Sequence, residues 1–177
     1  MKRIIGTVIA TLGLLCLCAA ARAEPVRSLL EIRREKVLIQ EWDVSCGAAA
    51  LATVLTYSLD DPISEREAAR AMLRRTDPLR VKVRGGFSLL DLKRLAESRG
   101  HSAEGYRNLS IEELSRMQSP IVPIDEIGDP HFVVVREIRD GTVRLADPAF
   151  GNRTVTLERF QRVWKEGIGF VVMRSAK

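Results

Sequence analysis

Cys46 and His131 are the residues of this chain whose types and positions are best suited to nucleophilic chemistry. Cys46 stands where the polar segment 40–45 gives way to an apolar, alanine-rich stretch, which is typical of the start of a buried helix. In the first turn of a helix, free backbone N–H groups and the helix dipole favour a thiolate over a thiol. The alternative role is that of a small buried apolar residue beside Ala48. Position alone leaves both roles open.

A thiolate nucleophile needs a base, and the chain has two histidines. His101 follows Gly100, a glycine that we expect to end a helix, and we expect this histidine at the surface. His131 begins a β-branched run after Gly128-Asp129-Pro130, so its side chain can face a cleft at the end of a strand. A single strand histidine is more often structural than catalytic, but His131 is the better candidate for the base.

The base should be oriented by a third group on its other ring nitrogen. Asp147, which ends the next predicted strand, is the candidate. A two-residue loop at 140–141 would place Asp147 and His131 on opposite faces of the hairpin. A three-residue loop at 139–141 would pair Asp147 with Val133, on the face of His131, with roughly 7–8 Å between the backbones. The proposed triad therefore predicts the three-residue loop.

Gln40 precedes Cys46 by six residues and could complete such a site. Its side-chain amide can join the backbone N–H of Cys46 in donating hydrogen bonds to an oxyanion. Taken alone, a glutamine at this position is best explained as a solvated polar residue. The interpretation gains weight because suitably placed residues are present for all four roles, which are nucleophile, base, orienter of the base and oxyanion donor.

The elements that must position these residues change character along the chain. A charged segment at 26–37 predicts a lead-in helix or an extended arm, and helix patterns follow at 47–57, 68–73, 89–99 and 110–117. Strand patterns come next, at 120–124, 131–138, 142–146, 154–156 and 169–173, with a short helix at 157–164. Helices followed by an antiparallel sheet predict an α+β fold in one domain.

Residues 1–23 have the pattern of a secretory signal peptide. A basic start precedes an apolar run from Ile4 to Ala20, and Ala21-Arg22-Ala23 is a suitable cleavage site. We therefore expect a periplasmic or otherwise exported protein whose domain spans 24–177 and which has no membrane attachment after cleavage. A retained membrane anchor is the alternative.

Removal of this segment changes both the charge and the thiol content. The 177-residue chain has 28 basic and 23 acidic residues; three basic residues lie in the predicted signal peptide, so the net charge falls from +5 to +2. The remaining charges interleave, which does not indicate nucleic-acid binding. Cys16 and Cys18 leave with the signal, so Cys46 becomes the single cysteine of an exported chain. Such a thiol must be buried, bonded to another chain, or reactive.

Four segments resemble the bacteriocin-processing, double-glycine peptidases, a papain-like family. They are 40–55 (QEWDVSCGAAALATVL), 87–97 (FSLLDLKRLAE), 130–135 (PHFVVV) and 145–151 (LADPAFG), and the likeness covers most of residues 36–174. The resemblance implies a papain-like fold with Cys46 as nucleophile, His131 as base, Asp147 as its orienter and Gln40 in the oxyanion hole.

The chain also departs from the family pattern. Ser45 stands before the cysteine where the family commonly has an acidic residue, so the local electrostatics differ. Typical members are cytoplasmic domains fused to an ABC exporter and cut leaders after Gly-Gly, whereas this chain carries a predicted export signal. It resembles the stand-alone exported members found with bacterial surface-assembly systems, functional-amyloid secretion included. Gly85-Gly86 could suggest self-processing, but a turn before the next helix is the better interpretation.

We therefore predict an exported cysteine peptidase that cleaves a secreted protein or leader peptide, with small residues or Gly-Gly before the scissile bond, in a secretion or amyloid-assembly system. We expect no metal or organic cofactor, because two histidines and one cysteine are poor material for a zinc site. One alternative is a non-turnover peptide-binding module or secretion chaperone on the same fold. Another is acyl transfer to an amine instead of water.

Overall fold

The computed structural model describes residues 26–126 and 128–175. The predicted signal peptide, 1–23, lies outside the described residues. Within the described ranges, each helix is too short or too polar to cross a lipid bilayer.

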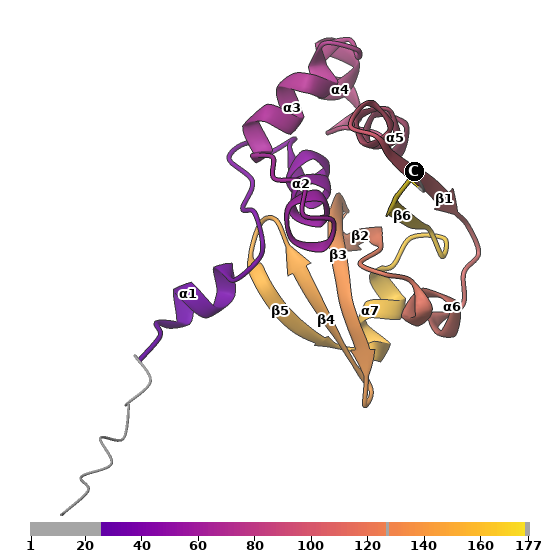
Figure 1. Ribbon diagram of the computed structural model, residues 1–177. Coiled ribbons are helices and arrows are strands. Elements are labelled where there is room, and N and C mark those ends of the chain that lie inside the picture. The colour runs from indigo at the N-terminus through magenta and orange to yellow at the C-terminus, as the bar shows by residue number, and fades with distance from the viewer. Residues whose placement is uncertain (1–25, 127, 176–177) are drawn as a thin grey trace, which may run out of the picture.

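Helices come first along the chain and strands later, as the sequence patterns predict. The first half contains α1 (Leu29–Arg34), α2 (Cys46–Ser58), α3 (Glu65–Leu73), α4 (Pro78–Arg84) and α5 (Leu89–Ser98). The second half contains β1 (His101–Tyr106), α6 (Ile111–Arg116), β2 (Ile121–Glu126), β3 (Asp129–Arg139), β4 (Thr142–Asp147), β5 (Gly151–Thr156), α7 (Leu157–Val163) and β6 (Gly169–Arg174). The strands form one antiparallel sheet in the order β1-β6-β2-β3-β4-β5 (Figure 1). The predicted α+β class is confirmed.

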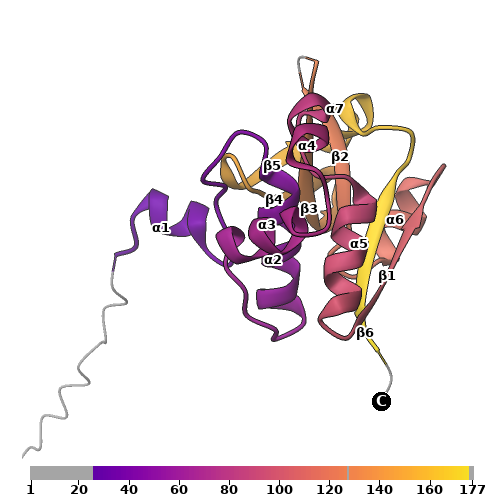
Figure 2. The ribbon, with the colours of Figure 1, turned by 90° about the horizontal axis from the view of Figure 1, so that it is seen from above.

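Two apolar cores cover the two faces of this sheet. The larger one joins α2, α3 and α5 to residues such as Val134 and Phe170 of the sheet. The smaller one joins α6 and α7 to residues such as Val133 and Val143, which point to the opposite face. The mostly apolar α2 is buried from Cys46 through Leu55 and lies against β3 (Figure 2). This packing fixes the helix that carries the cysteine against the strand that carries His131.

Local capping signals explain where most helices begin. Ser28, Ser64, Ser88 and Ser110 each accept a hydrogen bond from the backbone N–H three residues on, and the acidic residue there bonds back to the serine N–H. These reciprocal bonds satisfy N–H groups that a helix start leaves free. The predicted helices after residues 64, 88 and 110 are confirmed. The charged segment at 26–37 forms α1, which has no buried residue and packs mainly against β5.

Two elements escaped the prediction from sequence. One is α4, although Asp77 caps it, Pro78 opens it and Gly85 closes it with φ +79°, all ordinary helix signals. The other is β1, which begins at His101. The expectation that His101 lies at the surface is wrong: its side chain is 9% exposed and its Nε2 lies 3.0 Å from Oδ2 of Asp61. Pairing of β1 with β6 places the histidine against the turn that holds Asp61.

The hairpin between β3 and β4 also differs from the prediction. Arg139 pairs with Thr142, so the loop contains the two residues Asp140 and Gly141, and not three. Both have positive φ, 48° and 70°, which matches the twist of a tight hairpin. The register then shifts by one residue between Val135 and Glu137.

This shift is a β-bulge, and it changes the pairing of Asp147 in the same way as the predicted three-residue loop would have done. Beyond it, Val135 pairs with Leu145 and Val134 with Ala146, so continuation of the register places Asp147 level with Val133. The extra residue is Arg136, whose guanidinium donates a hydrogen bond to the carbonyl of Lys36. Asp147 therefore lies on the same face of the hairpin as His131 because of the bulge, and not because of the length of the loop.

Candidate active site

Cys46 is the first residue of α2, and its side chain is 4% exposed. The preceding Ser45 does not cap the helix: its hydroxyl donates to the carbonyl of Trp42 at 2.8 Å. The first turn of α2 contains no acidic residue. By contrast, α1, α3, α5 and α6 each use a serine and an acid to satisfy their first N–H groups. The start of α2 thus keeps its N–H groups and positive dipole end available to a negative sulfur or oxygen.

His131 lies at the beginning of β3 and bonds to Asp147. Its Nε2 is 2.7 Å from Oδ1 of Asp147, which leaves Nδ1 as the nitrogen for Cys46. Burial disfavours the charged imidazole, but hydrogen bonds to Asp147 and Cys46 outweigh it and raise the pKa of His131 from 6.5 to about 9. The ring therefore carries a proton at neutral pH and places a positive charge beside the Cys46 side chain.

Asp147 is fully buried, and hydrogen bonds account for both of its oxygens. Oδ1 accepts from His131 and from the backbone N–H of Ala149 at 2.9 Å, and Oδ2 accepts from Nε of Arg153 at 2.7 Å. Burial alone would raise the pKa of Asp147, but these bonds and the two neighbouring cations hold it below its ordinary value. A charged carboxylate is thus maintained behind the histidine.

Arg153 is a site residue that the sequence reasoning missed. It lies on β5, and its guanidinium also donates to Glu126 of β2 at 3.0 Å. Its pairing with Leu145, two residues before Asp147, makes it a diagonal neighbour of the aspartate. A basic residue diagonally across from Asp147 was the available signal, but it can be recognised only when the register between β4 and β5 is known.

Gln40 lies beside the site, but the structure does not show its amide in an oxyanion hole. Its backbone N–H donates to the carbonyl of Pro148 at 2.9 Å, which ties the segment before the helix to the turn after Asp147. Its Nε2 donates to the carbonyl of Trp42 at 3.1 Å, and its Oε1 is buried with no partner among the described residues. One hydrogen of Nε2 remains for another acceptor, and the oxyanion role stays a prediction.

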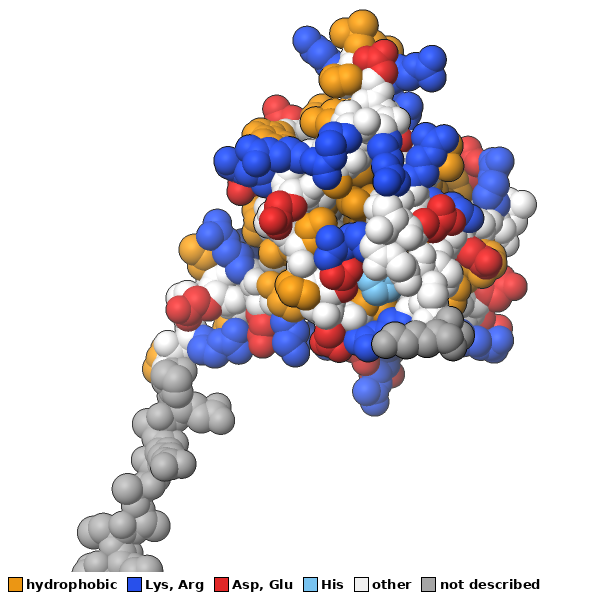
Figure 3. Space-filling model, turned by 45° about the horizontal axis from the view of Figure 1, so that its top comes forward, with side chains coloured by type: hydrophobic (Ala, Val, Ile, Leu, Met, Phe, Trp, Pro, Cys, Tyr) orange, Lys and Arg blue, Asp and Glu red, His pale blue; other side chains and the backbone are white. Residues whose placement is uncertain are grey.

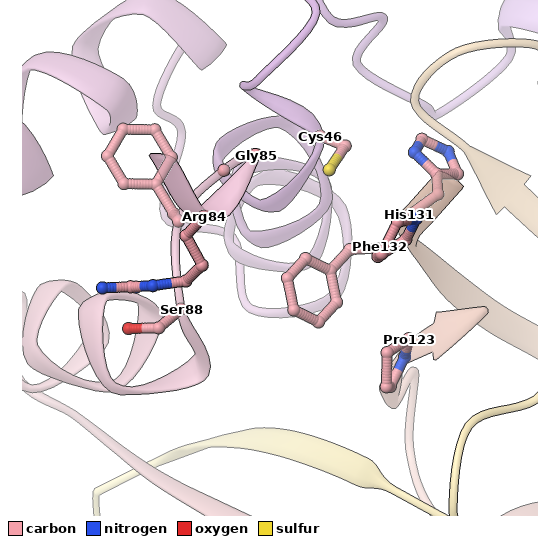
Figure 4. A pocket seen from close by; sticks show the side chains of 10 residues that line it. Cys46, Arg84, Gly85, Ser88, Pro123, His131 and Phe132 are labelled. Carbon is pink, nitrogen blue, oxygen red and sulfur yellow. The ribbon is translucent and has the colours of Figure 1, made fainter. Parts of the chain in front are cut away.

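A cleft opens between the Cys46 sulfur and the turn that joins α4 to α5. Figure 4 shows Cys46 between that turn and His131, with the ring of Phe132 below it. The lining residues are Cys46, Arg84, Gly85, Gly86, Phe87, Ser88, Pro123, Pro130, His131 and Phe132. Most of this wall is apolar or glycine.

Gly85 and Gly86 make different contributions to this wall. Gly85 ends α4 in the left-handed conformation, which confirms the turn interpretation of this pair. Gly86, with φ +153°, is buried, and a Cβ there would lie 3.2 Å from the carbonyl oxygen of Val44, just before the nucleophile helix. The close approach of the two backbones thus requires glycine at 86.

The model of the Peptidase C39 family matches residues 34–177. The chain belongs to this family. Its fold is therefore the papain-like fold of these peptidases.

Two relatives are at least 37% identical to this chain. The probable functional amyloid protease FapD of Pseudomonas aeruginosa is 39% identical over 149 residues, and that of Pseudomonas fluorescens is 37% identical over the same length. In each case the match covers 84% of this chain and 65% of the relative. The chain thus spans slightly less than two thirds of the length of these relatives.

Solved structures share the fold. A double glycine motif protease from an AMS/PCAT transporter, in complex with its leader peptide, has a TM-score of 0.64 and 26% identity, with 78% of this chain and 91% of that chain covered. The peptidase domain of Streptococcus ComA has a TM-score of 0.66 and 18% identity, with 78% and 98% covered. The second likeness concerns the fold alone.

Among the described residues, no group of three or more His, Cys, Asp or Glu side chains is placed to hold a metal ion.

Proposed function

We propose that the protein is an exported peptidase that cleaves a secreted protein or leader peptide through an acyl-enzyme on Cys46. The observation that carries this proposal is the connected set Cys46–His131–Asp147 at the edge of a glycine-walled cleft. A nucleophile, a base and its orienter in this order are the parts that acyl transfer requires.

In the first half of the reaction, the Cys46 thiolate attacks the scissile carbonyl and a tetrahedral oxyanion forms. The Cys46 backbone N–H, at the free start of α2, is the first oxyanion donor, and the second hydrogen of Gln40 Nε2 is our candidate for the other. His131, protonated at Nδ1, then donates that proton to the leaving amine. The amine departs and an acyl-thioester on Cys46 remains.

In the second half, His131 accepts a proton from water, and the resulting hydroxide equivalent attacks the thioester carbonyl. The carboxylic acid product leaves, and Cys46 departs as a thiolate beside the reprotonated histidine. Throughout, Asp147 holds the Nε2–H of the ring and stabilises its positive charge.

The cleft supports a substrate with small residues before the bond that is cut. Gly85 and Gly86 line one side of the cleft, and Phe132 and Pro123 also line it, so a peptide backbone with small side chains could lie close to Cys46 along the glycines. The names of similar proteins support the same proposal: two relatives are called probable functional amyloid protease, and one solved structure is that of a double glycine motif protease in complex with the leader peptide. We therefore propose a partner from a secretion or amyloid-assembly system and a periplasmic or otherwise exported location.

The test uses an electrophilic thiol probe and the secreted proteins encoded beside this chain. Wild-type protein should react with the probe at neutral pH and cut one of these proteins, and the Cys46→Ala variant should do neither. A Ser115→Ala variant, changed at an exposed hydroxyl on α6, serves as the matched control. An unreactive Cys46, with partner binding unchanged in Cys46→Ala, would show a non-turnover binding module and refute the proposal.

A further inference from the structure

A second groove, distinct in its chemistry, adjoins the catalytic cleft. Four arginines line it: Arg75 before α4, Arg80 and Arg84 on α4, and Arg94 on α5. We call it the basic groove. Figure 3 shows basic side chains gathered across the upper part of the molecule, where α3, α4 and α5 lie.

The sequence around α4 is unusually one-sided in charge. Residues 70–84 contain six basic residues and one acid, Asp77, whereas elsewhere basic and acidic residues interleave. The Oδ1 of Asp77 accepts a hydrogen bond from the backbone N–H of Leu79 at 2.8 Å, so this acid is engaged at the start of α4. This cluster of positive charges makes the local electrostatic potential more positive and so attracts anions.

Most of these guanidinium groups have no acidic partner. Asp91 is 4% exposed, accepts from the N–H and hydroxyl of Ser88, and pairs with Arg84 at 3.2 Å. Arg75 donates to the carbonyl of Arg94 at 3.3 Å. Within residues 26–126 and 128–175, Arg75, Arg80 and Arg94 form no ion pair with a carboxylate. Three cations thus remain available to a ligand.

The basic groove and the catalytic cleft share a wall. Arg84 and Ser88 line both. Figure 4 shows these two residues side by side, on the far side of the cleft from His131. A peptide chain whose scissile carbonyl lies at Cys46 can therefore continue into the groove without crossing another element.

We propose that the basic groove binds carboxylate side chains of the substrate on one side of the scissile bond. The inference rests on the proposed function and adds to it the charge of the substrate. A peptide is favoured over a membrane surface because the groove is continuous with the cleft that holds the nucleophile. Its arginines present planar, many-donor groups that suit carboxylates.

Two labelled peptides of sixteen residues test the proposal. Both carry a central Gly-Gly; one has four glutamates flanking it, two on each side, and the other has glutamine at the same four positions. Binding to the Cys46→Ala protein is followed by fluorescence anisotropy at rising salt. Two further variants are made in the Cys46→Ala protein. The first combines Arg80→Gln with Arg94→Gln, and the second, the control, combines Arg116→Gln on α6 with Arg162→Gln on α7.

The glutamate peptide should bind more tightly than the glutamine peptide, and the preference should shrink as salt screens the charges. The double change at Arg80 and Arg94 should weaken its binding about five- to tenfold, and the control pair should change it less than twofold. Bound glutamate peptide should also slow alkylation of Cys46 in the unmodified protein.

Equal binding of the two peptides, or equal effects of the two arginine pairs, would overturn the proposal. So would binding that leaves the alkylation rate of Cys46 unchanged. Phosphatidylglycerol vesicles form a further arm: their capture through Arg80 and Arg94, without binding of the glutamate peptide, would assign the groove to a membrane surface instead. Alkylation of Cys46 without peptide reports separately on the proposed function.

Discussion

The Nε2 atom of His131 lies 2.7 Å from Oδ1 of Asp147, although a two-residue turn joins their strands. That turn alone would place the two side chains on opposite faces of the hairpin, because side chains alternate along a strand. The bulge at Arg136 inserts one residue and reverses the alternation. The pair at the centre of the site therefore depends on a backbone irregularity five residues away from the histidine.

Replacement of Asp147 by asparagine should keep the shape of the site and remove its charge. Without the carboxylate, the pKa of His131 should fall below about 9, and the ring should lose its preferred orientation. We expect peptide cleavage to drop by about two to four orders of magnitude. The kcat/KM of the variant, and an NMR titration of His131, measure both effects. An unchanged titration would show that Asp147 does not control the histidine.

Cleavage should depend on pH through His131. The imidazolium that protonates the leaving amine persists up to about pH 9, so kcat/KM should fall by about tenfold per pH unit above that value. Alkylation of Cys46 needs the thiolate alone and should not fall in the same range. Parallel loss of both would contradict the assignment of His131 as the general acid.

The free energy of unfolding should depend on pH through His131 and Asp147, and the two residues should contribute in opposite directions. The raised pKa of His131 contributes stability fully below pH 6.5, and this contribution is lost as pH rises from there through about 9. The lowered pKa of Asp147 contributes stability above pH 3.8, which is lost as pH falls through its folded value. Urea unfolding across this range should give a maximum between these limits, and Asp147→Asn should flatten both sides.

Arg153 should act as a positioning residue behind Asp147. Arg153→Gln removes the bonds to Asp147 and Glu126 and leaves the buried carboxylate with fewer donors. We expect a loss of about 1–3 kcal/mol in the free energy of unfolding. We also expect a shift of the alkaline limb of kcat/KM, because the charge that faces His131 changes. Arg153→Lys should recover part of both effects; a stability loss without any shift of the pH profile would mean a structural role alone.

The two neighbouring glycines at 85 and 86 offer a matched comparison. Both have positive φ, so alanine at either position strains the backbone by about 1–3 kcal/mol. At 85 the added Cβ meets open space, whereas at 86 it lies 3.2 Å from the carbonyl oxygen of Val44 and must widen the contact beside the cleft. Gly86→Ala should therefore lower kcat/KM at least tenfold more than Gly85→Ala, and it should also lower the thermal stability more. Equal activities would show that this contact does not shape the cleft.

Most of the helices and their starts, with α4 as the exception, could be predicted from sequence because their signals are local. A serine and an acid three residues apart satisfy each other's backbone groups without help from the rest of the chain, and a continuous apolar run predicts the buried α2. The same local pattern placed Cys46 at a helix start and His131 at a strand start.

The rest of the site depends on contacts between distant segments. The pairing of β1 with β6 buries His101, and the β4–β5 register brings Arg153 to Asp147. The bulge at Arg136 decides which face of the hairpin Asp147 occupies, and no local pattern marks its position. Sequence by itself determined the chemical types and their elements; strand register, which is set by packing across the sheet, decided which of them meet.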